Sequence, residues 1–238
     1  MNYKTVVALA IGFTSVYTAI YYSISFNVDL TLLSIAMIFP LVFTIRGSFR
    51  RREKALEHLS QFRSTLKTLN YFVMSNDKFS NEDKDEIYTI LLEISDTVIS
   101  HLGKDDYNTD HLDAVIQKVH EFINEKGTLI NDRLKSKIFR FMADLHESVE
   151  NLHAINSHRT PISLRAYCKV FIYIFPLLYA PIIYNNVGVE TPSWIVYFIV
   201  LITEFILISL YNIQDKLEYP FDNDGLDDIK LDIFKLSR

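Results

Sequence analysis

The chain has 238 residues, of which 49% are hydrophobic and 22% are charged, and its formal net charge is −5 at pH 7. This balance excludes DNA or RNA as the main partner, because nucleic-acid binding needs basic residues gathered on one soluble face. The single cysteine, Cys168, excludes an intrachain disulfide and a cysteine-based zinc site, and its apolar surroundings predict a buried side chain.

The apolar residues are concentrated in two pairs of segments near the two ends, and the region between the pairs is polar and charged. This pattern predicts an all-α membrane protein with four transmembrane helices and a helical cytoplasmic domain between the two pairs. We expect two transmembrane helices in 1–48, the cytoplasmic domain in 49–160, two more transmembrane helices in 161–214 and an acidic cytoplasmic tail in 215–238.

The first predicted membrane helix is the uncharged run 5–28, which is long enough to cross a hydrocarbon core of about 30 Å. No small-residue cleavage site follows it, so we expect a retained helix and not a signal peptide. Asn27 and Asp29 are expected to form a tight turn before the second membrane helix.

The second membrane helix is predicted from residue 30, and a basic cluster follows its apolar part. The cluster consists of Arg46, Arg50, Arg51 and Arg52. By the positive-inside rule this helix enters the cytoplasm, and both termini should lie on the cytoplasmic side of an inner or plasma membrane. Pro40 removes a backbone donor within this helix, which is tolerated where a neighbour satisfies the freed carbonyl.

The cytoplasmic region has helical periodicity throughout. We expect the second helix to continue to about Met74, and three more helices to follow. The first begins at a Ser80 cap and stops at Gly103, the second begins at Thr109 and stops at Gly127, and the third covers about 129–156.

The last two membrane helices are predicted over 170–189 and 192–213. Asn185, Asn186 and Gly188 should form the outer loop, with Thr191 as N-cap and Pro192 as the first helical residue. The tail keeps an amphipathic pattern that is expected to pack on the cytoplasmic helices, made by Ile229, Leu231, Ile233, Phe234 and Leu236.

No catalytic motif is present, so the sequence does not indicate an enzyme. His146, Glu150 and His153 share one helical face, which is typical either of a solvated or intersubunit polar surface or, as the alternative, of a metal site. Glu204 interrupts the last membrane helix; it contacts an ion, faces a polar neighbour or is protonated in place.

An apolar stripe on the second helix is the candidate pore lining. It consists of Leu32, Ile35, Ala36 and Phe39. Such a stripe usually packs against a neighbouring helix, but in a symmetric assembly it forms a hydrophobic constriction, with the basic cluster raising the local anion concentration.

Three blocks of sequence resemble those of bestrophin-type channels. In 209–232 the matching positions are Leu210, Ile213, Leu217, Glu218, Pro220, Phe221 and Asp228. FTIRGSFRRREKA, from Phe43, is similar to the family's exit from the second membrane helix, and RTPIS, which contains Pro161, together with Tyr167 is similar to its entry into the third. The chain departs from the family pattern at Thr44, Ser209, Tyr211 and Asp222, which bears on local ion contacts.

The resemblance implies a homopentamer in which the second helices surround an axial apolar neck and pass chloride or other monovalent ions. The alternative is a non-conducting oligomeric scaffold or sensor. The family's animal members have an acidic calcium clasp after Pro-Phe, and the acids at similar positions are Asp222, Asp224, Asp227 and Asp228. Apart from this calcium, the sequence predicts no cofactor.

Overall fold

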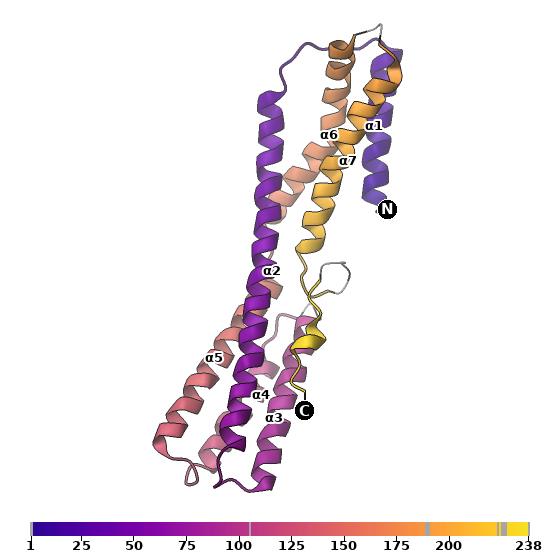
Figure 1. Cartoon of the computed structure of the whole chain (residues 1–238). Coiled ribbons are helices and arrows are strands. Elements are labelled where there is room, and N and C mark those ends of the chain that lie inside the picture. Colours follow the sequence, from indigo (N-terminus) through magenta and orange to yellow (C-terminus); the bar gives the residue numbers. More distant parts are fainter. Residues whose placement is uncertain (1, 105, 189–190, 223, 225–227, 238) are drawn as a thin grey trace. The chain divides into compact units, whose positions relative to one another are not determined.

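The computed structural model describes residues 2–237 except 105, 189–190, 223 and 225–227 (Figure 1). The described regular structure is entirely helical, which confirms the predicted fold class at this level. The helices are α1 (Tyr3–Tyr21), α2 (Thr31–Met74), α3 (Asn81–Leu102), α4 (Asp110–Glu125), α5 (Asp132–Ser157), α6 (Ile162–Val187), α7 (Ser193–Leu217) and the 3-10 turn η1 (Leu231–Phe234).

The chain divides into two compact units, each built from segments that are distant in sequence. Unit 1 comprises Met1–Phe49 and Thr160–Glu218, and unit 2 comprises Arg50–Arg159 and Tyr219–Arg238. Helix α2 therefore contributes its first part to unit 1 and its second part to unit 2.

Unit 1 contains the apolar helices. In Figure 1, α1, α6 and α7 lie side by side, and α1 packs on both of the others. Four helical segments of the described chain, namely α1, α2, the segment that ends with α6, and α7, are long and apolar enough to cross a membrane. Together with the fold, these segments indicate an integral membrane protein. Cys168 is buried in this unit, as the sequence predicts.

Helix α1 is shorter than predicted. It ends at Tyr21, because the Ile24 N–H bonds to the Ala19 carbonyl at 2.8 Å and the Ser23 N–H to the Ile20 carbonyl at 3.2 Å. This is a Schellman cap, and Ser23 takes the left-handed conformation (φ +53°) that glycine usually supplies there. Residues 22–30 thus form a longer connection than the predicted tight turn at Asn27 and Asp29.

Helix α2 runs unbroken through Pro40. A proline has no N–H, so the carbonyl four residues earlier, that of Ala36, loses its helical donor. The Tyr167 hydroxyl on α6 donates to the Ala36 carbonyl at 3.2 Å. A neighbouring helix therefore satisfies the freed carbonyl, which is how a membrane helix tolerates an internal proline.

The connection between α6 and α7 differs from the prediction. Asn185 and Asn186 belong to the last turn of α6, and Gly188 follows that helix with φ +85°. The Thr191 hydroxyl donates to the Val187 carbonyl at 2.7 Å, so it does not cap α7, which begins at Ser193 after Pro192. The predicted cap was wrong because Thr191 completes the preceding helix end.

Unit 2 is a bundle of the second part of α2 with α3, α4 and α5, built around one apolar core. Ser80 caps α3 in a capping box with Asp83, and Gly103 follows the end of α3, both as predicted. The tail packs on this bundle through Ile229, Leu231, Phe234 and Leu236, whereas Ile233 is exposed. The Leu236 N–H donates to the Ser95 hydroxyl at 2.8 Å, which fixes the tail on α3.

Candidate functional site

The apolar stripe predicted on α2 is exposed in the single chain. Leu32 is 81% exposed, Ile35 44% and Phe39 56%, and Ala36 is exposed as well. We call these four residues the exposed α2 face. Ile38, Val42 and Phe43 are also exposed, so the uncovered apolar surface is broader than the predicted stripe.

The opposite side of α2 packs within unit 1. Met37 and Leu41 are buried in the same apolar cluster as Cys168 and Ile172 of α6. Residues 37 and 41 are four apart and share one helical side, so their packing turns residues 32, 35 and 39 outward. The orientation of the exposed α2 face therefore follows from the contacts of Met37 and Leu41.

The predicted basic cluster begins at the end of the apolar segment. Arg46 and Arg50 are exposed, and Arg51 and Arg52 are partly exposed. Helix α2 carries all four guanidinium groups within two turns, which gives it a concentrated positive charge beyond the apolar part.

The Leu-Glu-x-Pro-Phe block is buried within the fold at Glu218, Pro220 and Phe221. Glu218, at the end of α7, is buried; its carboxylate accepts the Thr160 N–H and the Gln214 amide, the latter at 2.8 Å. This ties the end of α7 to the residue before Pro161, which immediately precedes α6. Phe221 is buried in the core of unit 2, and Pro220 is buried as well. These positions have structural roles within their own units.

The acidic residues after Phe221 are partly brought together. The Ile229 N–H donates to the Pro220 carbonyl at 2.9 Å, so residues 220 and 229 lie side by side. Partial burial raises the pKa of the Asp222 carboxyl, and a hydrogen bond with Asp228 raises it further. Asp222 and Asp228 both offer carboxylate oxygens, which are the hard donors that calcium prefers, so their chemistry fits the predicted ion. Asp227 lies outside the described residues, and calcium binding stays a prediction.

Glu204 of α7 is buried beside α1. A Cβ atom added at Gly12 would lie 3.8 Å from the Glu204 Cγ, an ordinary van der Waals distance, so the stem of the glutamate lies against α1 at Gly12. Neither carboxylate oxygen has a hydrogen-bond partner among the described residues. The structure therefore gives no support to a polar neighbour as the explanation, and Glu204 does not belong to the exposed α2 face.

The three predicted metal candidates on α5 separate into two groups. His146 and Glu150 lie with Asp113 of α4 in an exposed group, where His146 Nε2 is 3.7 Å from Asp113 Oδ1. His153 instead pairs with His101 of α3, with 3.0 Å between His101 Nε2 and His153 Nδ1. Of the three, His146 and Glu150 thus lie on an exposed polar surface, whereas His153 contacts α3 instead.

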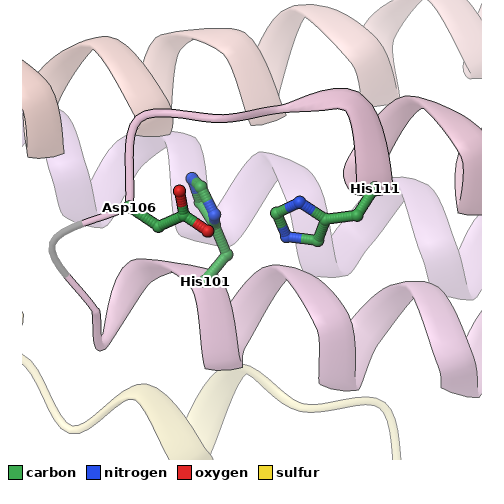
Figure 2. Close-up of side chains that lie close together, drawn as sticks. All are labelled: His101, Asp106 and His111. Atoms are coloured by element: carbon green, nitrogen blue, oxygen red, sulfur yellow. The ribbon is translucent and has the colours of Figure 1, made fainter.

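A second group was not anticipated from the sequence. His101, Asp106 and His111 come from the end of α3, the following loop and the start of α4, and Figure 2 shows their side chains converging. Burial lowers the pKa of the His101 imidazole, and the neighbouring His153 and His111 lower it further. The only sequence signal was the nearness of three potential ligands around the α3–α4 connection.

Comparison with known proteins identifies the fold. No protein-family model matches the sequence, and no match to a curated protein sequence was found. A bacterial bestrophin homologue from Klebsiella pneumoniae, solved with a point mutation, aligns with 98% of this chain and 93% of its own at 14% identity, with a TM-score of 0.80. Another structure of a bestrophin homologue from that organism has the same coverage and TM-score at 13% identity.

A further crystal structure, described as that of a membrane protein, has a TM-score of 0.81 at 12% identity and covers 98% of this chain. The chain therefore has the fold of the bacterial bestrophin homologues. The resemblance predicted from the three sequence blocks is confirmed at the level of the fold.

Proposed function

We propose that copies of this chain assemble around an axis into an ion channel of bestrophin type that conducts chloride or other monovalent ions. The exposed α2 face of each copy lines the shared pore as an apolar neck. We further propose a homopentamer in a cell inner or plasma membrane with both termini in the cytoplasm. The orientation is supported by the basic residues that follow the apolar part of α2.

The main support for this proposal is that one side of α2 is buried within unit 1 and the other side is exposed. Met37 is 2% exposed, whereas Leu32 on the other side is 81% exposed, in a chain with the fold of bestrophin homologues. A pore within one copy would need a polar pathway between its helices. The described helices of unit 1 pack instead through apolar clusters, so we place the pore between copies.

The proposed chemistry follows from the side chains on the exposed α2 face. Leucine, isoleucine and phenylalanine offer no hydrogen bond to an ion, so a ring of them holds water poorly and forms the main barrier to conduction. Arginine side chains just past this region raise the local concentration of anions. The apolar ring opposes ions of either charge, so it is the arginine charge that supports chloride as the conducted ion.

The rival function is a non-conducting scaffold or sensor in which the same face packs against lipid or protein. A flux assay with purified protein in liposomes separates the two. We expect chloride flux above that of empty vesicles. The absence of flux at every voltage and divalent-cation concentration would favour the scaffold.

Substitution of the exposed α2 face tests the neck itself. The triple change Leu32→Ala, Ile35→Ala and Phe39→Ala truncates the side chains that line the neck and so widens it. We expect it to raise flux several-fold, because water enters a wider neck more easily. The matched control is Leu33→Ala with Met37→Ala on the packed side, which should reduce stability more than flux. Equal effects on flux from both sides would show that the stripe is packing and not a neck.

The oligomeric state is tested independently by mass measurement in detergent. We expect five copies per particle. A clean monomer or dimer would remove the channel proposal, because no closed axis would then exist for the pore.

A further inference from the structure

Three side chains with metal-ligand atoms meet where α3 passes into α4 in unit 2. One such atom each from His101, Asp106 and His111 lies within 4.8 Å of those of the other two. The ring centroids of His101 and His111 are 5.1 Å apart. Asp106 stands in the loop between the two histidines, and Figure 2 shows its carboxylate beside the His101 ring.

His101 is the buried member of this group. The residue is 3% exposed, and its Nδ1 has no hydrogen-bond partner among the described residues. Buried polar atoms normally find a partner, so an orphaned ring nitrogen requires an explanation. A bound cation supplies one, because it accepts the lone pair that no protein donor uses.

The other nitrogen of His101 is held by His153. His101 Nε2 and His153 Nδ1 are 3.0 Å apart. When the proton is on His101 Nε2 and is donated to His153, His101 Nδ1 has a free lone pair, which is the form that binds a metal. A second residue that orients a ligating imidazole in this way is a regular feature of metal sites.

We propose that His101, Asp106 and His111 bind a divalent metal ion of the zinc class, with His153 as the positioning residue for His101. Two imidazoles and a carboxylate suit Zn²⁺, whereas Ca²⁺ and Mg²⁺ prefer a shell of oxygen atoms. This leaves a fourth tetrahedral position for water.

The side chains can close on a metal with small movements. Ligand atoms at about 2.1 Å from zinc in a tetrahedral site lie about 3.4 Å from one another. The 4.8 Å limit on the present separations is only moderately larger. Asp106 and His111 are exposed and can change rotamer, while the buried His101 stays in place. One Asp106 oxygen accepts the Asn108 N–H at 2.9 Å, and the other remains for the metal.

The ion would link three parts of unit 2. It joins the end of α3 to the loop and to the start of α4, and through His153 it connects with α5. We therefore expect zinc to stabilise unit 2 against unfolding, because the site exists only when these elements are folded together.

The test uses the tag-free full chain in detergent, stripped with EDTA, loaded with Zn²⁺ and desalted. Elemental mass spectrometry should find a single zinc ion per chain, and a competing chromophoric chelator gives its affinity. His111→Ala and Asp106→Asn, both at exposed positions, should weaken binding at least about tenfold and abolish the zinc-dependent rise in Tm. His153→Ala should lower affinity by about 10–100-fold while saturating zinc still fills the site.

The matched control is His146→Ala with Glu150→Gln, which removes the exposed group on the same bundle. This variant should keep the affinity of the unmodified chain, and far-UV circular dichroism should show that all variants fold. The proposal is overturned if the chain retains no zinc, if His111→Ala and Asp106→Asn bind as the unmodified chain does, or if the control variant loses the ion instead.

Discussion

The two parts of α2 place their apolar residues differently. In 50–74 a complete stripe is buried in the core of unit 2, made by Ala55, Leu59, Phe62, Leu66, Leu69 and Val73. In 31–49 the buried apolar residues are Met37 and Leu41, and larger side chains such as Phe39 remain uncovered. One helix thus finds its partners within the chain along one part and needs lipid or further copies along the other.

Truncating one phenylalanine in each part of α2 tests this difference and should give the largest effect. Phe62→Ala opens a cavity in the unit 2 core and should lower the free energy of unfolding by about 3–5 kcal/mol. Phe39→Ala removes an exposed ring and should change it by no more than about 1 kcal/mol. Denaturant titrations followed by circular dichroism give both values; equal losses would show that Phe39 packs within the chain.

A smaller effect is expected from the cap of α3. Ser80→Ala removes the hydroxyl that accepts the Asp83 N–H at 3.1 Å, and should lower the free energy of unfolding of unit 2 by about 1 kcal/mol. Trp194, the only tryptophan in the sequence, lies in unit 1, so its fluorescence transition should stay unchanged. Ser100→Ala, at an exposed position inside α3, is the control and should be close to neutral.

Tyr167→Phe tests a contact of the first part of α2 within unit 1. The change removes the donor to the Ala36 carbonyl and should lower stability by about 0.6 kcal/mol, the average for such bonds in a membrane protein. The loss should be seen in Trp194 fluorescence. Tyr173→Phe on the same helix is the control, and a larger loss from it would mean that the Tyr167 hydroxyl has no special role.

The smallest expected effect is a pH dependence confined to unit 2. Hydrogen bonds from Lys126 and Ser80 lower the pKa of the Asp83 carboxyl below its ordinary value of 3.8, with the Lys126 ammonium 2.9 Å away. Because the folded pKa is depressed, the stabilisation is present above pH 3.8 and is lost as the pH falls through the folded value. Asp83→Asn should flatten the acidic part of the plot of unfolding free energy against pH. If that part of the plot is unchanged, other carboxylates are responsible for it.

Local signals predicted much of the fold. The Ser80 cap and Gly103 gave the bounds of α3, and apolar periodicity gave the continuation of α2 to Met74. The end of α1 was missed because its apolar run continues past Tyr21, and a serine occupies the cap position where glycine would have been the signal. Such an end depends on backbone geometry that hydropathy does not report.

The candidate sites were predicted less completely, because they depend on contacts distant in sequence. Helical spacing grouped His153 with His146, but its partner His101 lies on another helix, 52 residues away in sequence. The same limit applied to Glu218, which the sequence marked only as a position of the matching block, whereas its hydrogen bond to Thr160 links two helix ends.

The bond between Tyr167 and the Ala36 carbonyl makes Pro40 and Tyr167 thermodynamically dependent on each other. Replacing Pro40 with alanine restores an amide that bonds the Ala36 carbonyl within the helix, so the tyrosine hydroxyl becomes dispensable. In a double-mutant cycle, Tyr167→Phe should therefore lower the free energy of unfolding by less in the Pro40→Ala background than in the unmodified chain. The tyrosine hydroxyl is therefore needed for this carbonyl only while residue 40 is a proline.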